Sequence, residues 1–132
     1  MKISIIGISQ ITDYILDNIV NHSDEINVYS KERNFDFENK NITKNNVSIF
    51  TDENIEDNMK KIFEDSDVLF FLSDSDPFNV FSYEKFLAYN PTKKSIFKVS
   101  DRDIYETYKN KKYPVISSFD LNDDDYLYLI RE

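Results

Sequence analysis

The sequence contains no cysteine and no tryptophan, and among its 132 residues it has one glycine, 3 prolines and one histidine. Without cysteine there are no disulfides, no thiolate nucleophile and no cysteine-ligated zinc. Because Gly7 is the only glycine, we expect left-handed turn positions elsewhere to fall mainly on Asn and Asp. The only histidine, His22, lies in a predicted loop, where a catalytic role is uncommon.

Basic residues are also scarce, since 16 Lys and Arg stand against 25 Asp and Glu, for a formal net charge of -9. Nucleic acids and anionic lipid surfaces are bound through clustered Lys and Arg, so this composition argues against both as partners. No apolar run approaches the roughly 20 residues that span a bilayer, and the N-terminal residues lead into a strand rather than a secretory leader. We therefore expect a soluble, cytoplasmic protein without membrane insertion.

What the chain does contain is enough apolar material for one core. Hydrophobic residues make up 40% of the sequence and aromatic residues 15%, so Phe and Tyr must supply much of the core volume. The length suits one domain covering residues 1–132, without a second core.

Apolar runs typical of strands alternate with segments of helical periodicity. The predicted strands are residues 2–6, 26–30, 47–50, 67–73, 95–99 and 113–117; the predicted helices are 10–20, a helix capped by Asp52, one starting at 74–77, 101–109 and 120–132. Residues 31–46 fit either a short irregular helix or a long loop. The alternation predicts an α/β fold with a doubly wound, parallel, six-stranded, Rossmann-like sheet.

Three features of individual elements are also predicted. Residues 67–73 are apolar on both faces, which is typical of a central parallel strand. Pro114 favours an edge position for the last strand. The helix after residue 74 is expected to bury five apolar side chains, which are Phe78, Phe81, Phe86, Leu87 and Tyr89.

In such a sheet, ligands bind beyond the carboxyl ends of the strands, where the strand order reverses. The turn that begins at Gly7 precedes a helix whose free N–H groups favour an anion. However, Ser9 and Thr12 stand where the phosphate-binding pattern G-x-G-x-x-G has glycines. After the second strand, Ser30 replaces the acid expected to bind ribose, while Lys31 and Arg33 could instead receive a 2′-phosphate.

The turn after the predicted central strand, residues 72–79, is the best-formed polar cluster. Ser73 or Asp74 is expected to cap the following helix, with Asp76 complementing its dipole. The same Ser73 and Asp74 could also contact a ligand, because they lie at the crevice. We found no Ser/His/Asp set, metal-ligand cluster or paired carboxylates, and residues 123–125 lack EF-hand spacing, so no enzyme and no metal site are predicted.

From residue 1 to about residue 121 the chain resembles the N-terminal nucleotide-binding domain of the TrkA/RCK (KTN) family of potassium-transport regulators. The resemblance is carried by residues 64–68 and 73–79, which match an acidic lead-in, a hydrophobic strand and a T-D-x-D-x-x-N segment. Residues 98–101 match an R-V-x-D-like segment, and residues 116–118 match a strand followed by a polar turn. The family's Gly-Asp pair falls on Phe50 and Thr51, with Asp52 one place beyond.

This resemblance implies a Rossmann-like fold, binding of NAD or an adenine nucleotide, dimerisation, and a potassium transporter or channel as partner. Carried over by position, the cofactor-binding residues are Gly7, Ser9, Gln10, Ile11, Ser30, Lys31, Asp52, Ser73, Asp74 and Lys98. We therefore predict a stand-alone, TrkA-N-like regulatory domain with a degenerate nucleotide site, which acts through dimerisation or protein contacts. The alternative is a fragment of an NAD(P)-dependent oxidoreductase.

Overall fold

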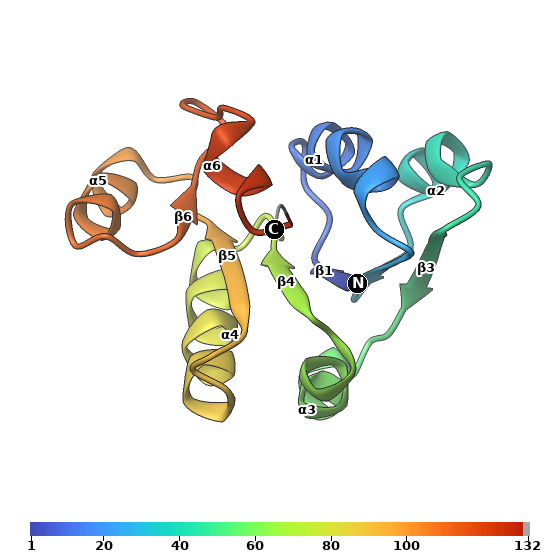
Figure 1. Cartoon of the computed structure of the whole chain (residues 1–132), viewed down its shortest axis with the longest axis horizontal. Coiled ribbons are helices and arrows are strands. Elements are labelled where there is room, and N and C mark those ends of the chain that lie inside the picture. Colours follow the sequence, from blue (N-terminus) through green and yellow to red (C-terminus); the bar gives the residue numbers. More distant parts are fainter. Residues whose placement is uncertain (131–132) are drawn as a thin grey trace.

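The computed structural model describes residues 1–130, and Figure 1 shows the arrangement of their elements. The strands are β1 (Lys2–Ile6), β2 (Glu25–Ser30), β3 (Val47–Thr51), β4 (Val68–Phe71), β5 (Lys94–Lys98) and β6 (Val115–Ile116). The helices are α1 (Thr12–Ile19), the 3₁₀ turn η1 (Val20–His22), α2 (Phe35–Asn41), α3 (Ile55–Asp65), α4 (Asp76–Tyr89), α5 (Arg102–Asn110) and α6 (Asp124–Leu127). Residues 31–46 therefore contain a short helix, α2, with loops on both sides.

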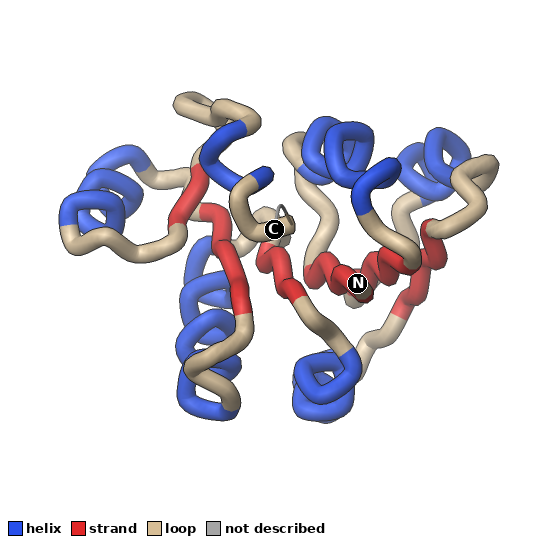
Figure 2. Tube along the Cα trace, in the orientation of Figure 1, coloured by secondary structure: helices blue, strands red, loops and turns tan. Residues whose placement is uncertain are grey.

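The strands form one sheet in the order β3-β2-β1-β4-β5-β6, and every neighbouring pair is parallel. Figure 2 shows the strands as a continuous twisted layer between the helices. The chain first winds outward from β1 to β3, then crosses back to β4 and winds outward in the opposite direction. The predicted doubly wound Rossmann-like α/β fold is confirmed, and its strand order reverses between β1 and β4.

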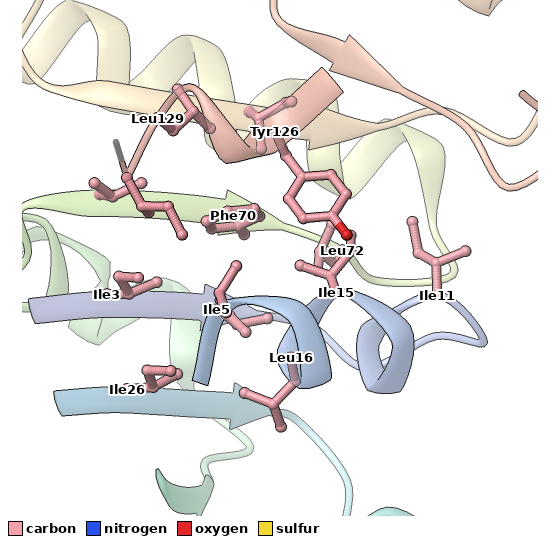
Figure 3. Close-up of a cluster of buried hydrophobic side chains, with 14 of the residues drawn as sticks. Ile3, Ile5, Ile11, Ile15, Leu16, Ile26, Phe70, Leu72, Tyr126 and Leu129 are labelled. Atoms are coloured by element: carbon pink, nitrogen blue, oxygen red, sulfur yellow. The ribbon is translucent and has the colours of Figure 1, made fainter. Parts of the chain in front are cut away.

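Each face of the sheet carries its own hydrophobic core. One core joins alternate residues of the central strands to α1, α2 and the segment from α6 to Ile130, and Figure 3 shows its centre around Ile5, Phe70 and Tyr126. The other core joins the opposite side chains of the same strands to α3, α4 and α5. All four residues of β4 are buried, which confirms the prediction of a central strand covered on both sides.

The edge prediction from Pro114 is also confirmed, because β6 is the last strand of the sheet. The helix predicted over residues 120–132 is much shorter than expected. Its helical part is α6, and the residues that follow turn back onto the core, where Leu129 and Ile130 are buried. Residues 131 and 132 lie outside the described part of the chain.

The prediction for the buried face of α4 is largely wrong. The buried residues are Asn79, Ser82, Tyr83 and Phe86, which lie on one face because they are spaced three and four residues apart. Phe81 is 59% exposed, and Leu87 and Tyr89 are also exposed. Two polar residues in the contact stripe explain the error, since apolar periodicity alone does not detect a helix face built partly from Asn and Ser.

Two helix caps also differ from the prediction. Ser75, rather than Ser73 or Asp74, caps α4, because its hydroxyl accepts a hydrogen bond from the N–H of Phe78 at 3.3 Å. The residue at the N-cap position of α3 is Asn54, and Asp52 lies two residues earlier.

Candidate functional site

A cleft of about 580 Å³ opens at the carboxyl ends of β1, β2 and β4, where the strand order reverses. Its lining residues come from the ends of these strands, from the loop before α2 and from the first turns of α3 and α4. They are Ile6, Gly7, Ile8, Tyr29, Ser30, Lys31, Glu32, Arg33, Asn34, Ile55, Ser73, Asp74, Ser75 and Phe78. The cleft is therefore at the place where doubly wound sheets bind ligands.

Gly7 lies at the base of this cleft and makes a contact that no other residue could make. Its φ is +99°, and a β-carbon at this position would lie 2.4 Å from the backbone nitrogen of Ser73. The end of β1 is fixed on its other side as well, since the N–H of Gly7 donates to the carbonyl of Tyr29 at 2.7 Å. The only glycine of the chain thus permits close approach of the β1 and β4 turns.

The turn between β1 and α1 uses two of its own N–H groups for internal hydrogen bonds. The N–H of Ser9 donates to the hydroxyl of Thr12 at 2.9 Å, and the N–H of Thr12 donates to the carbonyl of Ser9 at 3.1 Å. These donors are of the kind that would hold a phosphate at a helix N-terminus. Ser9, Gln10 and Ile11 do not line the cleft, so of the predicted residues in this turn only Gly7 does.

The Lys31 side chain extends across the cleft from the end of β2 to α3 and α4. Its ammonium forms an ion pair with Glu56 of α3 and lies 4.9 Å from the centre of the Phe78 ring of α4. The hydrogen bond from Lys31 is the main cause of the lowered pKa of the Glu56 carboxyl. Next to Lys31, Ser30 is buried and donates its hydroxyl to the carbonyl of Glu32 at 2.7 Å.

The loop that follows β2 forms one wall of the cleft. Arg33 donates from Nε to Glu38 at 2.8 Å, and its guanidinium lies 4.4 Å from the centre of the Phe35 ring. The Asn34 side chain caps α2 by accepting from the N–H of Phe37 at 3.0 Å. This wall is therefore held by the α2 cap and by exposed charged contacts.

The β4–α4 turn forms the opposite wall, and buried Asn79 holds it. The side-chain oxygen of Asn79 accepts from the N–H of Ser73 at 3.0 Å and from the Ser73 hydroxyl at 2.7 Å. Its side-chain nitrogen donates to the carbonyls of Ser73 and Lys98, at 2.9 and 3.1 Å. Asn79 thus joins the ends of β4 and β5 through one fully buried amide.

Asp76 ties the same turn to the start of α5. Its two carboxylate oxygens accept from the N–H groups of Ser100 at 2.8 Å and of Asp101 at 3.1 Å. Lys98 is only 4% exposed at its side chain, and its Nζ lies 3.6 Å from the carboxylate of Asp74, whose side chain is 81% exposed. Residues 73–79 and 98–101, two of the segments compared with the family pattern in the sequence analysis, are therefore in direct contact.

Not all of the predicted binding residues meet in the cleft. Gly7, Ser30, Lys31, Ser73 and Asp74 line it, whereas Ser9, Gln10, Ile11, Asp52 and Lys98 do not. Asp52 instead organises the turn before α3, accepting from the N–H of Asn54 at 2.9 Å and from Asn58 at 2.7 Å.

Several further residues line the cleft without having been predicted as site residues, among them Asn34, Ile55 and Phe78. Ile55 and Phe78 lie in the first turns of the helices that follow β3 and β4. Their positions just after strand ends are the signal that could have identified them, because such residues face the crevice in a doubly wound sheet.

The cleft combines an apolar base with a polar rim. Ile6, Ile55 and Phe78 supply apolar surface, and the rim carries Lys31, Arg33, Glu32 and Asp74 as charged groups. Within residues 1–130, no group of three or more His, Asp or Glu residues is arranged to hold a metal ion. This combination suits non-covalent binding of a small, partly apolar ligand with polar substituents.

The Tyr105 and Lys109 side chains form a pair, with Nζ donating to the phenolic oxygen at 2.8 Å. Both residues belong to α5, and neither lines the cleft. The hydrogen bond to Tyr105 is the main cause of the raised pKa of Lys109. This pair therefore provides no acid–base group beside a ligand in the cleft.

Comparison with known proteins does not assign this chain to a family. No protein-family model matches it, and no curated protein matches it either. No helix among residues 1–130 is both long enough and apolar enough to cross a membrane.

Proposed function

We propose that this chain is a TrkA-N-like regulatory domain connected with potassium uptake, and that its cleft binds an adenine nucleotide. The observation that carries the proposal is the cleft itself. Its volume of about 580 Å³ falls within the range of roughly 300–1,000 Å³ that is typical of small-molecule sites. It also lies at the reversal point of a Rossmann-like sheet, which is where nucleotides bind in such folds.

The ligand in this proposal is held differently from a dinucleotide in the usual pose. The turn before α1 uses the N–H groups of Ser9 and Thr12 for its own hydrogen bonds. The base would lie near Ile55 and Phe78, where it would displace the Lys31 ammonium from the Phe78 ring, and the phosphate or ribose would face Lys31 and Arg33.

The connection with potassium uptake rests on the resemblance between residues 73–79 and 98–101 and the corresponding family segments. The hydrogen bonds between these segments support treating them as one structural unit. Growth in limiting potassium, compared between the source organism and a strain that lacks the gene, tests this part of the proposal. Equal growth of the two strains would contradict it.

A thermal-shift titration with NADH, NAD, NADP, ATP, ADP and AMP tests the nucleotide site. At a hundredfold excess over Kd, a bound ligand stabilises the folded state by about 2.7 kcal/mol, which corresponds to a shift of several degrees. Flat curves for all six compounds would contradict nucleotide binding and leave protein contacts as the mode of action.

Two phenylalanines of α4 provide a matched pair of variants for this titration. Phe78 lines the cleft, whereas Phe81 is exposed and does not. We expect Phe78→Ala to reduce the nucleotide-induced shift and Phe81→Ala to preserve it, each measured against the unliganded variant. An equal response of both variants would place the ligand elsewhere.

A further inference from the structure

The backbone N–H and C=O groups on the outer edge of β3 match those of a second β3 strand in antiparallel orientation. In the β2–β3 ladder, the N–H of Ile26 donates to the carbonyl of Asn46 and the N–H of Asp52 donates to the carbonyl of Ser30. Even-numbered residues of β3 therefore direct their backbone groups towards β2. Since this direction alternates along a strand, Val47, Ile49 and Thr51 direct theirs away from the sheet.

These outward groups face an open edge, because β3 is the terminal strand of the sheet (Figure 1). Of the outward N–H groups, only that of Val47 has a recorded partner within residues 1–130, the carbonyl of Lys44 at 3.2 Å. The strand sequence Val-Ser-Ile-Phe-Thr contains no charge, proline or glycine. It therefore lacks the residues with which edge strands ordinarily prevent pairing.

We propose that two copies of this chain associate by antiparallel pairing of their β3 strands about Ile49. In this register the two Ile49 residues exchange both of their backbone hydrogen bonds. The N–H of Thr51 in each copy donates to the carbonyl of Val47 in the other. The result is one continuous sheet with a two-fold axis, and each copy contributes its β3 strand to the interface.

The side chains of β3 fit this register. Phe50 is 44% exposed and stacks on Tyr29 of the same chain, with ring centroids 5.2 Å apart. Pairing about Ile49 places Phe50 of one copy opposite Ser48 of the other. The small, exposed Ser48 leaves room for the ring, so pairing covers an aromatic surface that is open in the single chain.

The charges at the two ends of β3 also favour an antiparallel arrangement. Lys44 precedes the strand, whereas Asp52 and Glu53 follow it. Antiparallel pairing brings the cationic end of each copy to the acidic end of the other, although Lys44 also contacts Asp17 of its own chain. This local complementarity opposes the repulsion that a net charge of -9 on each copy produces at long range.

Sedimentation equilibrium of the full chain without nucleotide tests the pairing. We expect the mass to rise with concentration from 15.7 kDa to twice that value. Amide exchange at Ile49 and Thr51 should slow over the same concentration range. A constant mass of 15.7 kDa would overturn the proposal and leave nucleotide binding unaffected, since the cleft of one chain is complete.

Two variants test the strand directly. Thr51→Pro removes an outward donor without removing a bond to β2, and Ser48→Lys places an ammonium against Phe50 of the second copy. We expect each to weaken the dimer at least tenfold while circular dichroism shows an intact fold. Phe81→Lys changes an exposed site on α4 and should leave the dimer unchanged. Loss of the dimer in Phe81→Lys alone would assign the contact to another face and overturn the proposal.

Discussion

The backbone nitrogen of Ser73 lies 2.4 Å from the position that a β-carbon on Gly7 would occupy. This contact brings the carboxyl ends of β1 and β4 together at the base of the cleft. It also explains why the one glycine of the chain stands at this position, where both the close approach and a φ of +99° exclude other side chains.

Substitution of Gly7 by Ala should therefore be strongly destabilising. Overpacking against Ser73 and a left-handed backbone together should lower the free energy of unfolding by about 2–4 kcal/mol. Urea denaturation followed by circular dichroism measures this change. Ser9→Ala is the control in the same turn, because the Ser9 hydroxyl is buried without a recorded partner within residues 1–130, and it should change stability by less than about 0.5 kcal/mol. Similar values for the two variants would contradict the role of Gly7.

Asn79→Ala should also be costly, because it leaves the N–H of Ser73 and the carbonyl of Lys98 without their side-chain partner. Loss of these buried hydrogen bonds should lower the free energy of unfolding by about 2–4 kcal/mol. Asn58→Ala is a matched control, since Asn58 is exposed and bonds to Asp52 at the surface. If urea denaturation gave both variants the same stability, Asn79 would not be the residue that joins β4 to β5.

Ser82→Ala should leave stability unchanged or raise it by up to about 1 kcal/mol. Ser82 is fully buried, and its hydroxyl has no hydrogen-bond partner within residues 1–130. Burying such a hydroxyl without a hydrogen bond lowers stability, so its removal should not be costly. Ser66 is the contrasting buried serine, with its hydroxyl donating to the carbonyl of Ile62 at 2.6 Å. Ser66→Ala should cost about 1–2 kcal/mol in the same denaturation measurement. Destabilisation by Ser82→Ala as large as that by Ser66→Ala would show that the Ser82 hydroxyl has a partner.

The protein should lose stability in alkali. Burial is the main cause of the raised pKa of Tyr126 and of Tyr83. In the unfolded chain these phenols ionise at about pH 10. The stabilisation is therefore complete below that pH and decreases as the pH rises towards the higher folded-state values.

Urea denaturation at a series of alkaline pH values checks this prediction. Tyr126→Phe should flatten the fall in stability relative to the unmodified chain. A fall of equal steepness in Tyr126→Phe and the unmodified chain would show that Tyr126 does not contribute.

Most of the fold could be predicted because its strands are short apolar runs and the segments between them have helical spacing. β4 is the clearest case, since burial on both faces requires an uninterrupted apolar sequence. α4 could not be predicted in the same way. Its contact with the sheet depends on Asn79, whose partners lie in two separate strand ends, so the stabilising interactions are visible only in three dimensions.

The candidate site was predicted in part for the same reason. Strand ends place Gly7, Ser30 and Ser73 at the cleft, and the position of a strand end follows from the sequence pattern. Whether the following turn faces the cleft depends on its hydrogen bonds. The Thr12 hydroxyl draws in the N–H of Ser9, a local arrangement that the glycine pattern alone does not describe.

The two walls of the cleft are held by different kinds of interaction. Buried hydrogen bonds of Asn79 fix the β4–α4 wall, whereas the surface pair Arg33–Glu38 holds the loop after β2 and the partly exposed pair Lys31–Glu56 spans the cleft. Salt weakens surface ion pairs, since the screening length is only about 8 Å at physiological ionic strength. We therefore expect rising salt concentration to loosen the ion-paired side of the cleft while the side held by Asn79 stays fixed.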